Sequence, residues 1–316
     1  MYLNGKKWRY FSTFGYYCIF NKYTYFYMTI RSLKQKWFMR PFRPIIPFVG
    51  KVVYTSIDGF ESLFGLRDDL TPPRRMIFIG NGNYKAIGNE FVGYFKDLCN
   101  LKPDDSVLDV GCGLGRMAAP LTQYLSPTAR YEGFDIVEKA IDWATKHITA
   151  KYPNFRFTYT PLYNKLYTAY NKNHTGNKTE AAEKFRFPYE DESFDLVYLT
   201  SVFTHMLPAD LENYMSEIRR VLKKGGKCLI TYFLLNKESL SLIDEGKAQF
   251  TFQYKFDKYQ IETKDVPEDA IAYDETYIKE LYQKYNLQIQ EPIRYGMWCG
   301  RKNFLSGQDI IIAQKQ

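Results

Sequence analysis

Short apolar runs alternate with amphipathic stretches along most of this chain. Val107, Leu108 and Val110 form one run typical of a strand buried on both faces, and a helix after it can bury Met117, Ala118 and Leu121. Further strands are expected at residues 131–137, 194–197 and 227–233. A helix is expected from the periodic spacing of Leu211, Tyr214, Met215, Ile218, Val221 and Leu222, with Gly225 and Gly226 ending it. The repeated strand–helix alternation predicts a three-layer α/β/α sandwich.

The last eighty residues continue this pattern after an irregular segment. A helix is expected over residues 277–285, a strand over 287–295 and a last strand over 309–313. Residues 236–274 lie between the fifth strand and this helix, where an insertion can cover a substrate or simply pack. In it, Phe250, Phe252, Tyr254 and Phe256 alternate as in a strand or hairpin.

The most informative segment is the turn that follows the first strand. Gly111, Gly113 and Gly115 let the backbone turn sharply and leave its amide groups open to a ligand. The dinucleotide fingerprint has the spacing G-x-G-x-x-G and binds a pyrophosphate. Here the spacing is G-x-G-x-G, and Asp109 stands two residues before it, where a carboxylate would repel a pyrophosphate. A cationic ligand such as S-adenosylmethionine, which carries an ammonium and a sulfonium, suits this turn better.

The stretch VLDVGCGLGRM (107–117) resembles the first motif of class I S-adenosylmethionine-dependent methyltransferases. Two further stretches resemble that family, FPYEDESFDLVYLTSVFTHM (187–206) and RVLKKGG (220–226). The resemblance covers residues 77–315 and implies a Rossmann-like, seven-stranded, mostly parallel sheet with an antiparallel last strand. It also implies S-adenosyl-L-methionine as the cofactor, with this set of binding residues: Asp109, Gly111, Cys112, Gly113, Gly115, Asp135, Ile136, Thr200 and Ser201.

Within that set, individual roles follow from position. Asp109 and the three glycines are expected to hold the methionine part, and the backbone of Thr200 and Ser201 the region near the sulfonium. Asp135 stands about 20 residues after the turn, where Rossmann-type folds bind ribose hydroxyls, although an Asp there can also be a helix N-cap. One departure from the family concerns adenine. Residues 158–164 carry no acid after the third strand, which leaves Asn164 or backbone carbonyls to replace it.

A catalytic residue is less clearly indicated. Methyl transfer requires mainly that the acceptor lie opposite the sulfur, and a base helps when the acceptor carries a proton. His205 follows the carboxyl end of a strand and is the candidate base, or alternatively a brace for the cofactor pocket. Trp298 and Arg301, between the last two strands, are candidate substrate contacts or packing residues.

The sequence indicates the acceptor only by class. A hydroxyl of a small molecule or glycan is expected, and base-amine methylation is disfavoured because no N/D-P-P-Y/F motif follows the fourth strand. The alternatives are an RNA or lipid-soluble acceptor, or a cofactor-binding module without transfer activity.

Charge separates the N-terminal part from the rest. Residues 1–57 contain ten basic and no acidic residues, whereas the remainder has a net charge of −2. This extension is also rich in aromatic residues, a composition that can bind a membrane interface or single-stranded nucleic acid. It can equally be a leader before a start at Met28. We therefore expect an extension and linker over 1–57 and a methyltransferase domain over 58–316.

Cysteine and histidine usage excludes some kinds of site. The five cysteines are scattered without C-x-x-C spacing, and only three histidines occur. This pattern favours free thiols in a reducing compartment, and hence a cytoplasmic protein without a metal site, while the basic extension leaves a membrane-peripheral location open.

Overall fold

The computed structural model describes residues 55–61, 63–65, 67–77, 83–167 and 181–316. The chain divides into two compact units, Met1–Ile87 and Gly88–Gln316. Nearly all of the N-terminal extension expected from the sequence lies outside the described residues, and so do the expectations attached to it.

In the first unit, the described residues are organised around one buried carboxylate. Asp58 lies in a helical stretch, residues 55–61, and is 2% exposed. It accepts hydrogen bonds from the backbone N–H groups of Arg74 and Arg75, in and beside the 3₁₀ turn η2 (Arg74–Met76), and from the Arg67 guanidinium. These bonds satisfy the buried charge locally.

The second unit is built on a seven-stranded sheet with the order β10-β11-β5-β4-β1-β2-β3. Strands β1 to β5 are parallel, and β11 runs antiparallel to both β5 and β10. The expected seven-stranded sheet with an antiparallel last strand is therefore confirmed. The strands are β1 (Val107–Val110), β2 (Tyr131–Asp135), β3 (Phe155–Tyr159), β4 (Phe194–Leu199), β5 (Leu222–Tyr232), β10 (Leu287–Ile289) and β11 (Asp309–Lys315).

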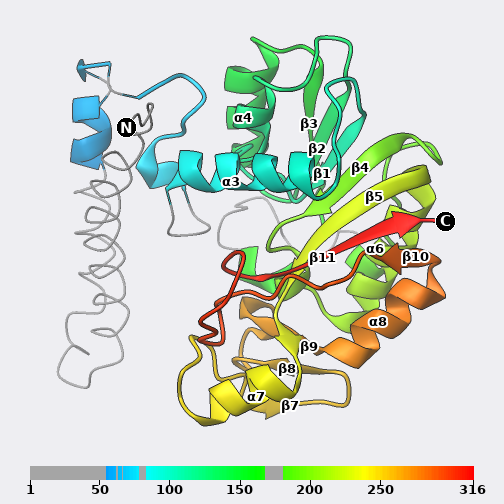
Figure 1. Cartoon of the computed structure of the whole chain (residues 1–316). Coiled ribbons are helices and arrows are strands. Elements are labelled where there is room, and N and C mark those ends of the chain that lie inside the picture. Colours follow the sequence, from blue (N-terminus) through cyan, green and yellow to red (C-terminus); the bar gives the residue numbers. More distant parts are fainter. Residues whose placement is uncertain (1–54, 62, 66, 78–82, 168–180) are drawn as a thin grey trace, which may run out of the picture. The chain divides into compact units, whose positions relative to one another are not determined.

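Helices cover the sheet because its strands are apolar on both faces. Leu108 and Val110 of β1 belong to the core that includes α6 and α8, which lie side by side in Figure 1. The alternate residues of β1 face the other way, so the sheet needs a helical layer on each side. The helices are α3 (Tyr84–Asp97), α4 (Ala118–Leu121), α5 (Glu138–Ala144) continued by the π-helical turn η3 (Thr145–Thr149), α6 (Pro208–Val221) and α8 (Glu275–Lys284).

A second, four-stranded sheet occupies the expected insertion between β5 and α8. Its order is β6-β9-β8-β7, and Figure 1 shows it with α7 beyond the end of β5. Its 3₁₀ turn η7 contacts η6 and η4, two short turns that follow β4 and β3. Its elements are β6 (Leu234–Leu235), α7 (Lys237–Asp244), β7 (Tyr254–Lys255), β8 (Tyr259–Ile261), η7 (Pro267–Asp269) and β9 (Ile271–Asp274). The turns outside it are η4 (Lys165–Tyr167), η5 (Ala182–Lys184) and η6 (Phe203–His205).

Several elements differ from the sequence expectation, and three of these differences have a clear physical reason. Helix α6 ends at Val221, before the two glycines, because Leu222 is already extended and pairs with Phe194 of β4. Strand β10 ends at Ile289 rather than at residue 295, and Pro292 has no N–H to continue a ladder.

The third difference concerns the alternating aromatics of the insertion. Within the run of alternating aromatic residues, 250–256, only Tyr254–Lys255 forms a strand. Phe250 and Phe252 instead pack with Phe233 and Trp298 in a separate aromatic cluster. Burial of these rings outweighs their local strand pattern.

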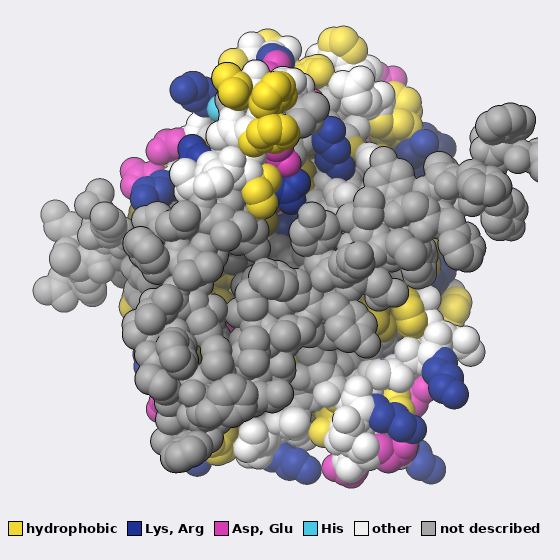
Figure 2. Space-filling view, turned by 90° about the vertical axis from the view of Figure 1, so that its left-hand side faces the viewer, with side chains coloured by type: hydrophobic (Ala, Val, Ile, Leu, Met, Phe, Trp, Pro, Cys, Tyr) yellow, Lys and Arg dark blue, Asp and Glu magenta, His cyan; other side chains and the backbone are white. Residues whose placement is uncertain are grey.

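The described surface is mixed in charge. On the face drawn in Figure 2, lysine and arginine side chains are interspersed with acidic ones around the described part. No helix in the described part of the chain is both long enough and apolar enough to cross a membrane.

Candidate functional site

The residues predicted to bind the cofactor meet at the carboxyl ends of three adjacent strands. Val110 at the end of β1 pairs with Phe134 of β2 on one side and with Leu199 of β4 on the other. The glycine turn, Asp135 and the Thr200–Ser201 turn therefore emerge at the same edge. In open α/β sheets, ligands bind at this edge.

The glycine turn can form only without side chains at two of its positions. Gly111 and Gly115 have φ angles of +78° and +74°. A Cβ on Gly111 would lie 2.5 Å from Cγ2 of Val202, and one on Gly115 would lie 2.6 Å from Cδ1 of Ile148. The turn is thus held close against the chain after β4 and against the turn after α5.

The amide groups of this turn are not open, contrary to the sequence expectation. The N–H groups of Gly111 and Cys112 donate to the carbonyl oxygen of Phe134, at 2.9 and 3.1 Å. The Gly113 N–H donates to Oδ2 of Asp135 at 2.7 Å, and the Gly115 N–H donates to the Cys112 carbonyl at 2.9 Å. A pyrophosphate would need such donors, so this turn is poorly suited to bind one.

Space does exist beside Gly113. A Cβ built there would have only the Asp135 carboxylate within reach, at 4.0 Å. A ligand that approaches the turn at this point meets a carboxylate rather than a row of N–H donors.

Asp135 is fixed but retains acceptor capacity. Its Oδ1 accepts the Val137 N–H at 2.8 Å and its Oδ2 accepts the Gly113 N–H, and the Ile136 N–H also bonds to this carboxylate, so that part of its acceptor capacity remains. Burial raises the pKa of this carboxyl to about 6, although the backbone hydrogen bonds oppose the shift. The remaining lone pairs can accept hydrogen bonds from ribose hydroxyls.

Asp109 lies deeper, between the strands that flank β1. It is 2% exposed, and its Oδ2 accepts the Tyr131 hydroxyl at 2.7 Å, while the Tyr198 hydroxyl lies 3.1 Å from that of Tyr131. Burial raises the pKa of Asp109 to about 7, and the bonds from the two phenols lower it. Both tyrosines were missed in the sequence, because their proximity depends on strand pairing.

The turn after β4 is strained and tied to two other segments. Ser201 has a φ angle of +59°, uncommon for a residue with a side chain. Its N–H donates to Thr231 of β5 at 2.8 Å, and its hydroxyl donates to Gln308 at 3.0 Å. Gln308 also accepts the Thr231 hydroxyl at 2.7 Å, so one side chain that the sequence analysis missed holds the backbone beside Thr200 and Ser201. Strain maintained in this way is typical of functional sites.

His205 lies in η6, just beyond this turn, and contacts the insertion. Its Nδ1 lies 2.8 Å from the carbonyl oxygen of Glu268 in η7. A carbonyl can only accept, so Nδ1 carries the proton and Nε2 of the neutral ring keeps its lone pair. Burial lowers the pKa of His205, which keeps the ring neutral. Asn164 donates to the His205 carbonyl at 3.0 Å, so the amide expected near adenine supports this turn.

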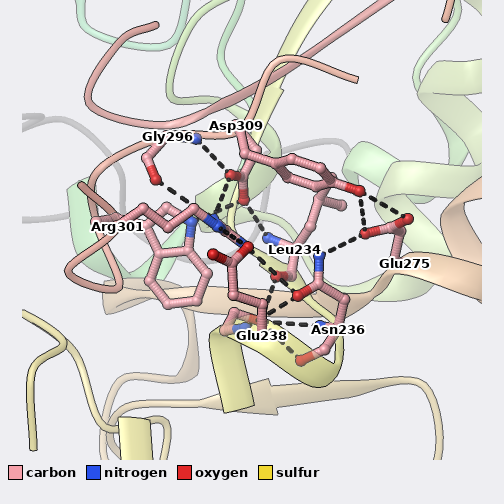
Figure 3. A network of polar contacts seen from close by, with 10 residues as sticks. Leu234, Asn236, Glu238, Glu275, Gly296, Arg301 and Asp309 are labelled. Atoms are coloured by element: carbon pink, nitrogen blue, oxygen red, sulfur yellow. Dashed lines mark hydrogen bonds and ion pairs between the residues drawn. The ribbon is translucent and has the colours of Figure 1, made fainter. Parts of the chain in front are cut away.

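Trp298 and Arg301 belong to a buried polar network, drawn in Figure 3. Its centre is Asp309, which is fully buried and accepts the indole N–H of Trp298 at 2.7 Å and the Arg301 guanidinium at 3.0 Å. Backbone N–H groups of Leu234 and Gly296 also donate to it.

The other side of the network reaches the insertion. Arg301 pairs with Glu238 of α7 at 2.8 Å and lies 4.6 Å from the ring centroid of Tyr295. The two predicted substrate contacts are therefore buried: Trp298 is 3% exposed and Arg301 is 6% exposed. The polar groups of both side chains are hydrogen-bonded to other residues of this chain. Their position joins the loop before β11 to the insertion, and a role in acceptor binding stays a prediction.

Of the thiols in the described part of the chain, only that of Cys112 lies in the glycine turn. The four cysteines of the described part, Cys99, Cys112, Cys228 and Cys299, are free and buried. Burial raises the pKa of the Cys112 thiol well above its usual value, so it lies in the turn as a neutral side chain. Within the described ranges, no group of three or more His, Cys, Asp or Glu side chains is placed to hold a metal ion.

Comparison with known proteins agrees with this geometry. Residues 108–230, which include the glycine turn, Asp135 and the turn after β4, match the family model described as a methyltransferase domain. They form a class I methyltransferase domain. S-adenosylmethionine is the cofactor of this domain.

Curated relatives of the methyltransferase domain differ in what their names say they methylate. The chain is 24% identical over 188 residues to phosphoethanolamine N-methyltransferase 2 of Caenorhabditis elegans, covering 59% of this chain and 34% of that protein. It is 31% identical over 133 residues to a sterol 24-C-methyltransferase of Gibberella zeae, covering 42% of this chain and 29% of that protein. The chain thus spans about a third of the length of these two relatives.

Among solved structures, the chain is similar to a SAM-dependent methyltransferase from Methanosarcina mazei. The identity is 22% and the TM-score is 0.45, and the match covers 68% of this chain and 94% of that one.

Proposed function

We propose that this chain transfers a methyl group from S-adenosylmethionine to a small-molecule acceptor, at a hydroxyl group. The observation that carries the proposal is the glycine turn. Its N–H groups at Gly111, Cys112, Gly113 and Gly115 are used within the chain, whereas a carboxylate lines its open side. This environment favours a cation over a phosphate.

Different residues of the site would bind different parts of the cofactor. Asp135 accepts the ribose hydroxyls, beside Ile136 and Cys112. Asp109 supplies negative charge near the methionine part, which lies along Gly111, Gly113 and Gly115. The Thr200–Ser201 backbone, held by Gln308, borders the sulfur. When bound, the cofactor supplies an electrophilic methyl group on a sulfonium, and the protein must hold the acceptor in line with it.

His205 supports a hydroxyl acceptor because it is arranged as a base. Its Nδ1–H is donated to the Glu268 carbonyl, the Asp269 backbone also bonds to the ring, and in the tautomer with the proton on Nδ1 the acceptor atom is Nε2. Burial keeps the ring neutral, so Nε2 can take the proton that a hydroxyl loses as it is methylated. The same contact joins the insertion, residues 236–274, to the turn that carries His205, which supports a role for the insertion in covering the acceptor.

The relatives support a small-molecule acceptor but do not indicate which atom is methylated. Their names specify phosphoethanolamine nitrogen and a sterol carbon. These acceptors are small molecules of different chemistry, so relatedness supports a small molecule, and the choice of a hydroxyl rests on His205.

Calorimetry tests the cofactor assignment. S-adenosylmethionine and S-adenosylhomocysteine should bind with micromolar dissociation constants, and NAD should not bind measurably. A preference for NAD, or no binding of either sulfur ligand, would sink the proposal.

Acceptor and base are tested together with radiolabelled methyl donor and a cell extract separated into small molecules, glycans, RNA and lipids. Label should appear in the small-molecule fraction. His205→Gln should slow labelling by about 100-fold or more with unchanged cofactor affinity. His147→Gln is the matched control, because His147 lies in η3, at the far end of the helix after β2, and stacks on Trp143. Label in RNA or lipid only would overturn the acceptor class, and binding without labelling of any fraction would indicate a silent module.

A further inference from the structure

Asp109 carries a buried negative charge that the described part of the chain does not neutralise. It is not in an ion pair with any described Lys or Arg side chain, and it accepts a hydrogen bond from the uncharged Tyr131 phenol, whose oxygen lies 3.1 Å from the Tyr198 hydroxyl. The nearest groups able to ionise besides these are Asp135 and Cys112, whose negative charge would add to its own. In these surroundings the negative charge of the buried carboxylate is uncompensated, and a cation bound beside it would neutralise that charge.

The two phenols come from the strands on either side of β1. Tyr198 of β4 pairs directly with Asp109, and Tyr131 of β2 lies two residues before Gly133, the β2 partner of Asp109. Their side chains point to the same face of the sheet as the carboxyl. The register of the sheet therefore brings both hydroxyls to the face that carries the carboxyl, with Tyr131 donating to Asp109 and Tyr198 hydrogen-bonded to Tyr131.

Both rings are held rigidly. Tyr131 stacks on Phe155 with ring centroids 4.7 Å apart, and Tyr198 stacks on Phe95 at 4.3 Å. Neither tyrosine is exposed at all. Burial and stacking on both rings favour a fixed position of the two hydroxyls beside the carboxyl.

We propose that Tyr131 and Tyr198 are positioning residues that keep Asp109 ionised and oriented for the ammonium group of the cofactor's methionine part. This inference rests on the proposed function, because it assumes that S-adenosylmethionine binds at the turn. A phenol donates a stronger hydrogen bond to a carboxylate than to a neutral carboxyl, so these hydroxyls favour the state that attracts a cation. Their hydroxyl protons are not transferred, since burial raises the pKa values of Tyr131 and Tyr198 well above the usual range.

The inference predicts that binding depends on pH in a way set by these hydroxyls. With the pKa of Asp109 at about 7, affinity for ligands that carry the ammonium should rise as the pH increases from 6 to 8. Loss of one phenol donor raises that pKa by about one pH unit. Tyr131→Phe should then bind S-adenosylhomocysteine about fivefold more weakly at pH 7 and about equally at pH 9.

Calorimetry from pH 6 to 9 with two probes tests this. S-adenosylhomocysteine carries the ammonium, and methylthioadenosine lacks the methionine part that bears it. Only the first should show the pH dependence, and only Tyr131→Phe and Tyr198→Phe should shift it. Tyr232→Phe is the matched control, because Tyr232 forms a similar buried pair with Tyr282, at 3.0 Å, without a carboxyl.

Each outcome decides the point. A pH-independent loss of affinity in both variants, or the same pH shift with methylthioadenosine, would overturn the inference. If a variant does not fold, the wild-type protein still decides, since equal pH profiles for the two probes would contradict a role for the ammonium. Failure of wild-type protein to bind either sulfur ligand would instead refute the proposed function.

Discussion

Replacement of Asp109 by Asn should stabilise the cofactor-free protein at high pH while it weakens cofactor binding. The pKa of Asp109 is raised from its ordinary 3.8 to about 7 by burial. A carboxyl whose pKa is higher in the folded than in the unfolded chain stabilises the fold when protonated. That contribution is fully present below pH 3.8 and is lost as the pH rises through 7.

The size of the effect follows from the two pKa values. With both states titrating, the ionised carboxyl costs about 4 kcal/mol at pH 8 and about 2 kcal/mol at pH 5, relative to a neutral group. Asp109→Asn mimics the neutral group. The free energy of unfolding of the variant minus that of wild type should therefore be about 2–3 kcal/mol larger at pH 8 than at pH 5. Any fixed cost of the amide cancels in this difference.

Urea titrations of both proteins at pH 5 and pH 8, followed by circular dichroism without cofactor, measure this difference. S-adenosylmethionine should raise the melting temperature of wild type at pH 8 and have much less effect on the variant. A difference between variant and wild type that is the same at both pH values within about 0.5 kcal/mol would refute the argument, because Asp109 would then be equally charged at both.

Three further predictions concern other parts of the chain. In chemical denaturation, Asp309→Asn should lower the free energy of unfolding by about 4 kcal/mol, because the amide leaves buried donors without an acceptor. Glu238→Gln, at the 61% exposed end of the same network, should lower it by less than about 0.5 kcal/mol. Equal effects of the two substitutions would contradict the role of Asp309 as the centre of the network. Gly111→Ala should abolish cofactor binding and destabilise, because its Cβ has no space, while Gly93→Ala, with open space in α3, should not destabilise. Removal of residues 1–27 should leave the dissociation constant of S-adenosylmethionine unchanged in calorimetry, and a tenfold loss would show that the extension contributes to the site.

The pH dependence of methyl transfer provides a separate check on His205. Because burial lowers its pKa, the ring should remain a neutral base below the ordinary histidine value of 6.5. At saturating S-adenosylmethionine, transfer should therefore decline only at a more acidic pH, and His205→Gln should lose that decline. A rate that falls around pH 7 in wild type and variant alike would point to another titrating group, such as Asp109.

The sequence by itself determined the sheet and the location of the cofactor turn. Strands β1 and β11 contain the apolar runs that the sequence shows, and the spacing of Leu211 to Val221 predicts a helix, so local pattern and final structure agree. The glycines around Gly113 specify a turn that other residues cannot form. These features depend on neighbours in the sequence, which is why they could be read from it.

Tertiary structure decided what the polar groups of the site do. Strand register brought Tyr131 and Tyr198 to Asp109 and closed the Gly113 amide with Asp135, and folding of the insertion set the tautomer of His205 through Glu268. It also ended α6 at Val221 and buried Arg301. Each of these depends on which distant segment lies alongside, and on the loss of water there. The spacing of residues along the chain indicates neither which distant segments become neighbours nor which groups lose contact with water.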